Sequence, residues 1–296
     1  MSRRVSIALD EGLAGGRQRG TAVRSSTEFR RVSCPDMTTP GPAAGRPWPT
    51  RHRAAALCAL CAAANSLPAH AYRPFDSTDA SVADERELEF ELGPLGRIRE
   101  GPAKLQIVSA LVVNYGLAGE REVVLEGKVV RTQDDAQAAS SRTSLADAAL
   151  SLKQVHRRGS LQGESGMSVA SECSILLPTI HGEPGIGASA ALIGSQRWPA
   201  ATVHLNGALA FNRSHRWSRF FGAIVEGPNE WTVRPVAEVF AEKQTGTGAT
   251  RSRLLGVIWR AKEDLSFDLG FRTASGPEVR VHEVRAGLTW ALPMAK

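Results

Sequence analysis

Residues 202–212 read TVHLNGALAFN, and residues 265–272 read LSFDLGFR. In the second stretch Leu265, Phe267, Leu269 and Phe271 fall on every second position, with polar or small residues between them. A period of two places the two kinds of side chain on opposite faces of a β-strand. Strands of about 9 to 11 residues with one apolar and one polar face are typical of a transmembrane β-barrel, in which the apolar face meets lipid.

Ten further segments show this alternation or are bounded by turn residues in the same way. They cover residues 87–92, 105–115, 123–129, 148–153, 167–177, 188–193, 220–226, 232–242, 252–260 and 279–290. Gly93-Pro94 is expected to close the first segment, and a bulge or a phase change is expected near His282, where the apolar parity changes. The polar stretch 132–143 is expected to be an external loop. Twelve is an even count, as bacterial barrels usually require, and we predict an all-β fold: a transmembrane antiparallel up-and-down β-barrel of about 12 strands over residues 86–292. A barrel of this size is expected to have a narrow or plugged lumen.

The front of the chain predicts export. Arg51 and Arg53 precede an apolar run over residues 54–67 and the triplet Ala69-His70-Ala71, a pattern typical of a bacterial signal peptide over residues 51–71 with cleavage between Ala71 and Tyr72. This run is shorter than the roughly 20 residues that a spanning helix needs. Residues 1–50 are expected to be a disordered extension, or to be untranslated if Met37 is the start. Residues 72–85 are expected to form a periplasmic lead-in.

Charge and cysteine content exclude two classes of function. The chain has 36 Lys and Arg and 30 Asp and Glu, but ten of the basic and four of the acidic residues lie before residue 72, which leaves 26 of each. The expected barrel is therefore neutral overall, and a nucleic-acid partner is not predicted. Only Cys173 lies beyond residue 71, which excludes a disulfide framework and a four-cysteine metal site there.

The candidate site residues are charged side chains on the inward-facing parity of the expected strands. A barrel interior needs such charges paired and hydrogen-bonded, so a conducting role and a purely structural role are both open. These lumen-facing candidates are Glu87, Glu89, Glu91, Glu126, Lys128, Arg234, Glu238, Glu242, Asp268, Arg272 and Arg285. On the same reasoning, a charge introduced at the lipid-facing Leu269 is expected to be costly, and the same charge at Gly270 is expected to be tolerated.

Motifs for catalysis, cofactors and metals are not found. The chain contains no G-x-S-x-G and no H-E-x-x-H motif, and its glycines at 182, 185 and 187 have the wrong order for a dinucleotide loop. No catalytic, cofactor-binding or metal-binding residue is predicted. An outer-membrane lipase built from Ser214-His215 or another histidine is a minor alternative, considered for His156, His181, His204, His215 and His282.

Several motifs together resemble the outer-membrane barrels grouped under the phenol-degradation meta-pathway name, which are often described as transporters. The resemblance covers most of residues 72–292 and rests on YRPF at 72–75, Asp79, NYG at 114–116, LPT at 177–179, the glycines at 182, 185 and 187, Asn206, RPVAEVF at 234–240 and EVRAGLTW at 283–290. Two features depart from it. The chain continues beyond Trp290 as ALPMAK, which puts recognition by the barrel-assembly machinery in doubt, and only two tyrosines leave a thin aromatic girdle of Trp198, Trp217, Trp231, Trp259 and Trp290.

The resemblance implies a Gram-negative outer-membrane location, with membrane lipid and the barrel-assembly machinery as partners. We expect passive passage or binding of small molecules, apolar or aromatic ones if the family's name describes its function, and no enzymatic activity. A structural or scaffold barrel and a soluble periplasmic β protein are the alternatives, and the lipase is a third.

Overall fold

The computed structural model describes residues 73–100, 103–133, 142–180, 184–276 and 280–294. The predicted N-terminal extension, the signal peptide and its cleavage site after Ala71 lie outside these ranges. The described chain forms twelve strands: β1 (Glu87–Glu100), β2 (Ala103–Leu117), β3 (Arg121–Gln133), β4 (Arg142–Arg157), β5 (Ser168–Leu176), β6 (Gly187–Arg197), β7 (Thr202–Phe211), β8 (Trp217–Glu226), β9 (Val233–Gln244), β10 (Ala249–Arg260), β11 (Leu265–Ser275) and β12 (Arg280–Pro293).

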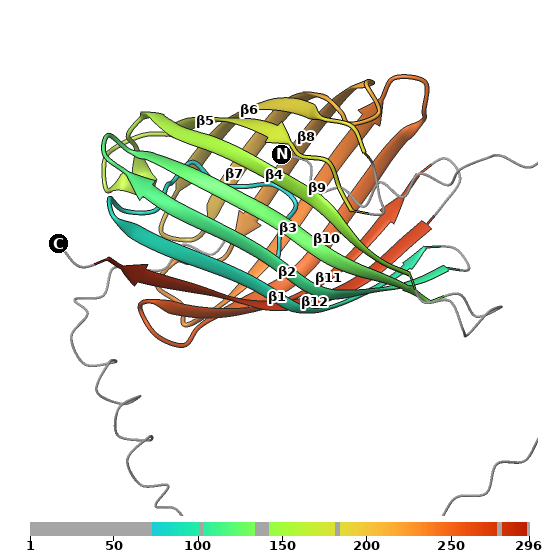
Figure 1. The fold of residues 1–296 in the computed structure, drawn as a ribbon. Coiled ribbons are helices and arrows are strands. Elements are labelled where there is room, and N and C mark those ends of the chain that lie inside the picture. Colours follow the sequence, from blue (N-terminus) through green and yellow to red (C-terminus); the bar gives the residue numbers. More distant parts are fainter. Residues whose placement is uncertain (1–72, 101–102, 134–141, 181–183, 277–279, 295–296) are drawn as a thin grey trace, which may run out of the picture. The chain divides into compact units, whose positions relative to one another are not determined.

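The strands close into a barrel in which each strand is antiparallel to its neighbours in the sequence and β1 pairs with β12 (Figure 1). Glu87 lies opposite Pro293 at the end where β1 begins and β12 ends, which we call the terminal end; the other is the opposite end. Closure leaves no unpaired strand edge, which is what a sheet in hydrocarbon requires. The predicted all-β fold and its twelve strands are confirmed. A single 3-10 turn (Ser160–Gln162) precedes β5, and none of the helical segments described is long and apolar enough to span a membrane.

Side chains alternate between the two faces of the barrel wall as the sequence predicts. In β11, Ser266, Asp268 and Arg272 are buried on the inside, whereas the side chains of Leu269 and Phe271 point outward and are 52% and 51% exposed. The five tryptophans of the expected girdle are all exposed. The outer face is therefore apolar and the inner face is polar.

One prediction about a strand end is wrong, and the change near His282 proves to be one of polarity phase without a bulge. β1 does not stop at Gly93-Pro94 but continues to Glu100, because a register shift between Leu92 and Leu95 absorbs the pair as a bulge. The expected bulge near His282 is absent from the described part of β12, whose pairing with β11 is continuous from Arg280 to Trp290. Val281 instead faces inward, where it packs against the cluster of Ile98 and Val130. The inner wall at this height is apolar, so the alternation is kept while the polarity pattern changes.

Residues 73–86, which we call the inner segment, lie inside the barrel and not outside it as a periplasmic lead-in. Arg73, Phe75, Asp76 and Ser81 are all buried, and the segment crosses the lumen from the wall at β11 and β12 to that at β3. It leaves the lumen at Arg86, whose backbone N–H donates to the carbonyl of Gly116. The fold of the described chain is thus a filled barrel.

Candidate functional site: the lumen and its inner segment

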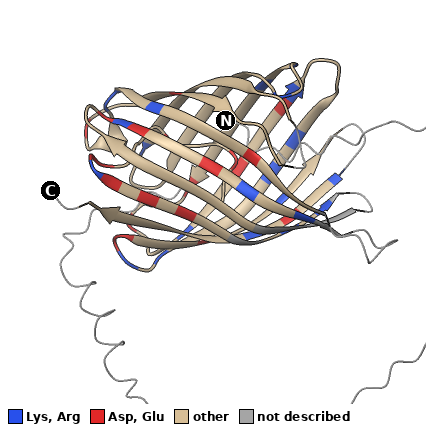
Figure 2. Cartoon of the chain, in the orientation of Figure 1, with Lys and Arg blue, Asp and Glu red and all other residues tan. Residues whose placement is uncertain are grey.

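The eleven charged residues singled out in the sequence lie on the inner side of the strands. Seven of them are buried or nearly so, and Glu126, Lys128, Arg234 and Glu242 are half-buried. Lys128 forms an ion pair with Asp147, which a left-handed backbone conformation and a register shift between β3 and β4 turn toward the lumen. Figure 2 shows the charged residues on the strands of the barrel.

Arg73 begins the inner segment and binds the wall at β11 and β12. Its Nε donates to Asp268 Oδ2 at 3.2 Å, and its Nη2 donates to the carbonyl of Ala286. Two glycines make room for the guanidinium, because a Cβ at Gly287 would lie 2.3 Å from Arg73 Nε and one at Gly93 would lie 2.6 Å from Nη1. Larger residues at either position would displace the arginine.

Arg285 joins the inner segment to the wall through charge. Its Nη2 lies 3.2 Å from Asp76 Oδ2 and 2.8 Å from Glu283 Oε2, and its Nη1 donates to the carbonyl of Pro74 at 2.8 Å. Glu283 also accepts from Arg272 Nε at 2.7 Å. The pairs Arg272–Glu283 and Arg285–Glu283 form within the wall and need no residue of the inner segment. Asp76, in contrast, needs the two arginines to neutralise its buried charge.

Phe75 occupies an apolar pocket, one of several apolar clusters on the inner side of the wall. The side chain is 1% exposed and packs with Ile224, Val236, Leu254 and Ile258 on β8, β9 and β10. Fully burying an aromatic ring of this kind contributes about 1.5 to 3 kcal/mol. The pocket is therefore the main apolar anchor of the inner segment.

Glu238 binds the backbone of the inner segment directly after Phe75. Its carboxylate accepts from the N–H of Asp76 at 3.0 and 3.1 Å and from the N–H of Ser77 at 2.6 Å. A carboxylate that accepts two backbone amides is a strong, charge-assisted acceptor. Gly222 lies next to this turn, since a Cβ there would lie 2.2 Å from Ser77 Oγ.

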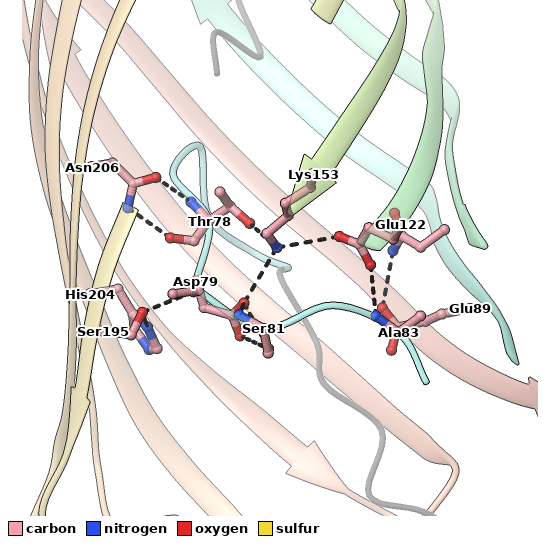
Figure 3. A network of polar contacts seen from close by, with 12 residues as sticks. Thr78, Asp79, Ser81, Ala83, Glu89, Glu122, Lys153, Ser195, His204 and Asn206 are labelled. Atoms are coloured by element: carbon pink, nitrogen blue, oxygen red, sulfur yellow. Dashed lines mark hydrogen bonds and ion pairs between the residues drawn. The ribbon is translucent and has the colours of Figure 1, made fainter. Parts of the chain in front are cut away.

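Asn206 and Lys153 bind the middle of the inner segment (Figure 3). Asn206 Oδ1 accepts from the N–H of Thr78 at 3.1 Å and its Nδ2 donates to the carbonyl of Thr78 at 2.7 Å, as a neighbouring strand would. Lys153 is fully buried and lies 3.5 Å from Asp79 Oδ1 and 3.3 Å from Glu122 Oε1. Glu122 in turn accepts from the N–H of Ala83 at 2.7 Å.

Ser195, His204 and Glu226 form a series that has the residue types of a hydrolase triad. Ser195 Oγ lies 2.8 Å from His204 Nδ1, and His204 Nε2 lies 3.4 Å from Glu226 Oε1. However, the hydroxyl is buried on the lumen side and accepts from the N–H of Ala80 at 2.9 Å (Figure 3). It does not face lipid, as the lipase alternative requires, and its contact to Ala80 assigns it to anchoring the inner segment.

The other histidines do not supply such a site either. Ser214 donates to Asn212 Oδ1 and His215 stacks on Phe211, so the adjacent Ser214 and His215 do not pair. His156 contacts Ser171 on the exposed side of the wall, and His282 is exposed on β12. His181 lies outside the described residues. Within the described ranges, no group of three or more His, Cys, Asp or Glu residues is placed to hold a metal ion.

Sequence reasoning missed the partners that come from the inner segment and several wall residues. Glu122, Lys153 and Glu283 lie on the polar parity of their strands, so the alternation already pointed inward for them. For Arg73 and Asp76 no periodic signal exists, because the segment is not a strand; the match of YRPF at 72–75 to the family pattern was the one available indication.

With the inner segment in place, the lumen leaves little room for a solute. A cavity of about 60 Å³ lies between Arg73, Asp76 and the wall at β2, β3 and β12, and another of about 30 Å³ lies near Thr78 and Glu122. A cavity that holds benzene measures about 150 Å³, so these two hold water at most. A larger cavity of about 380 Å³ lies at the terminal end, between residues 81–85 and the loops after β2 and β4.

Comparisons with known proteins support the fold. No protein-family model and no curated protein sequence matches the chain. Among solved structures, the NanC porin is similar with a TM-score of 0.51 and 7% sequence identity, over 69% of this chain and all of that one. Similarity also extends to an outer membrane channel from Pseudomonas putida F1 (TM-score 0.49, 12% identity, 73% of this chain and 98% of that one) and to the KdgM porin (0.47, 11%, 69% and 98%). At these identities the likeness concerns the barrel fold alone.

Proposed function

We propose that the chain is an outer-membrane channel for passive passage of small apolar or aromatic molecules, and that the inner segment occupies the route in the structure. A closed twelve-stranded barrel with an apolar outside and a charged inside supports the membrane location. An exported barrel inserts from the periplasm, and an even strand number returns the chain to its starting side. The terminal end therefore faces the periplasm and the opposite end faces the exterior.

The observation that carries the proposal is that several ion pairs of the wall do not involve the inner segment. Lys153–Glu122, Arg272–Glu283 and Arg285–Glu283 are all contacts within the wall. A charged lumen can persist when water replaces the segment, because these ions keep their partners, while water takes the place of the segment at Asp268 and Glu238. The pocket of Ile224, Val236, Leu254 and Ile258 would then be free to receive an apolar group of a solute in place of Phe75.

A scaffold barrel is the competing function. Its supporting observation is the number of buried polar contacts between the segment and the wall, which fit a lumen that stays closed. The two functions differ in whether the segment must move, because the two cavities beside residues 73–78 are smaller than a benzene site and the larger cavity lies only at the terminal end.

A reversible lock distinguishes them. The side chain of Asn206 exchanges two hydrogen bonds with the backbone of Thr78, so cysteines are introduced at both positions, in a Cys173→Ser background, to bridge the segment to the wall, and the disulfide is verified by mass before the assay. Ser151 and Ser174 are direct partners on β4 and β5 whose hydroxyls lie 2.8 Å apart, and cysteines there staple two wall strands without touching the segment. This second pair is the matched control.

Conductance in planar bilayers and uptake of phenol into proteoliposomes are measured before and after reduction. The channel function predicts that the Thr78→Cys/Asn206→Cys protein is closed when oxidised and regains wild-type passage when reduced, while the Ser151→Cys/Ser174→Cys protein conducts in both states. Absence of passage in every variant and state would support the scaffold. Retention of the protein in urea-washed membranes, with heat-modifiable migration on a gel, tests the location separately, since a soluble periplasmic protein would appear in the wash.

A further inference from the structure

We propose that the outer surface of β8–β12 near the opposite end binds the phosphate groups of a phosphorylated glycolipid of the outer leaflet. The site is a basic patch of Arg219, Lys243, Arg251, Arg253 and Arg280, all exposed and on the outward parity of their strands. The inference rests on the outer-membrane location proposed above but not on conduction through the lumen.

Strand register places the five side chains on one continuous surface. Arg219 on β8 lies directly opposite Lys243 on β9. Arg251 on β10 pairs with Ala241, the next outward position of β9 after Lys243, so the two basic groups are diagonal neighbours. Ser275 on β11 lies between Arg251 and Arg280, as the partner of both. Such direct and diagonal neighbours have Cβ atoms about 5 to 8 Å apart, so the patch can engage more than one phosphate at once.

The patch has no acidic counterpart on its own face. Of the outward positions that the structure describes in this half of β8–β12, none carries Asp or Glu. Arg219 and Lys243 are like charges directly opposite each other, an arrangement that destabilises a sheet unless an anion lies between them. Arg253 is held on the outer face by a hydrogen bond from its Nε to Oγ1 of Thr273, its partner on β11, at 3.1 Å. An external anion would therefore neutralise charges that have no acidic partner on this face.

The position of the patch along the barrel axis favours a lipid headgroup as this anion. The next outward residues toward the terminal end are Phe221, Leu255 and Phe271, all exposed and apolar. The basic side chains therefore border the band that contacts acyl chains, and long side chains at this border extend to the headgroup level. Arginine binds phosphate through two parallel hydrogen bonds, and several arginines together favour a lipid with more than one phosphate over a zwitterionic phospholipid.

The terminal end has a different charge pattern. Arg121 and Lys262 are exposed there, but Glu120, Glu263 and Asp264 lie beside them in the same turns. In Figure 2, Lys and Arg are prominent on the strand ends away from the C-terminus. The patch therefore belongs to one leaflet, and the terminal end supplies a charge-matched control.

The test measures binding of purified bisphosphorylated lipid A to the membrane-extracted protein in detergent, by native mass spectrometry and microscale thermophoresis. Arg251→Ala/Arg253→Ala should weaken binding by about 30-fold, the factor expected for two basic side chains at a charged lipid surface. Arg121→Ala/Lys262→Ala removes the same charge at the terminal end and should change the affinity less than twofold. With the wild-type protein, dephosphorylated lipid A and phosphatidylcholine should bind at least about 30-fold more weakly.

Equal losses in the two double variants, or wild-type binding that does not depend on the lipid's phosphates, would overturn the site. The same variants are tested for retention in urea-washed membranes. Retention without phosphate-dependent binding removes the lipid site and keeps the barrel in the membrane, whereas release into the wash removes the proposed location itself.

Discussion

Replacing Phe75 with alanine should release the inner segment from the lumen. Phe75 is 1% exposed and packs with Ile224, Val236, Leu254 and Ile258, whereas every strand of the wall keeps its backbone partners when the ring is removed. The loss should therefore fall on the docking of the segment and not on the closure of the barrel.

The size of the effect follows from the burial of the ring. Truncating a fully buried phenylalanine to alanine costs about 3 to 5 kcal/mol. At about 1.4 kcal/mol for each factor of ten, the ratio of docked to released segment should fall by about 140- to 3,700-fold. The contacts of Arg285, Glu238 and Asn206 to the segment oppose release to the same extent in both proteins, so they cancel from the ratio.

The assay reports the released fraction through a buried position of the segment. Ser81 is 5% exposed, so Ser81→Cys in a Cys173→Ser background reacts with a water-soluble maleimide only after release. The modification rate at residue 81, read from peptide masses, should rise by the same factor in the Phe75→Ala protein. Phe271→Ala is the matched control, because Phe271 is 51% exposed on the outer face of β11 and does not touch the segment. Equal modification rates for the two variants would refute the assignment of the pocket as the anchor.

Three further outcomes are expected. Leu269→Arg should destabilise the barrel folded in vesicles by about 2 to 4 kcal/mol, measured by urea titration, because Leu269 faces outward near the middle of β11. Gly270→Arg should instead keep the barrel but raise its conductance, because a Cβ there lies 2.8 Å from Pro74 and the longer side chain displaces the inner segment; unchanged conductance would contradict this. Lys153→Met should destabilise the protein by about 3 to 5 kcal/mol in the same urea titration, since it leaves Glu122 buried without its cation, and Glu122→Gln in addition should recover part of the loss.

The Gly270 prediction adds a displaced inner segment to what the alternation of β11 indicates by itself. On the sequence, Gly270 is a small residue on the polar face, and a charge there is expected to be tolerated. In the structure that face is covered by Pro74, a residue that lies 196 positions earlier in the chain. Parity tells which face a residue occupies, but not what covers that face.

The charged residues show the same division. The period of two places Asp268, Arg272 and Arg285 inside the barrel correctly, because inside and outside are the only two options for a strand residue. Their partners are a different matter: Asp268 binds Arg73, and Arg285 binds Asp76 and Glu283. Which charges meet depends on the register of strands and on the path of a segment that has no period of its own.

The sequence by itself determined the strand number, the closed barrel and the face of the wall residues wherever polarity alternates regularly, because alternating polarity along a strand is a local property that can be recognised without knowing the strand's partner. The bulge in β1 at Gly93-Pro94, the inward turn of Asp147 and the filling of the lumen by residues 73–86 were decided only in the tertiary structure. The physical reason is that an irregular segment is fixed by what it contacts. The contacts of Phe75 with its apolar pocket, of Asp76 with Arg285 and of Thr78 with Asn206 form only when the barrel has brought β7, β9 and β12 around one lumen.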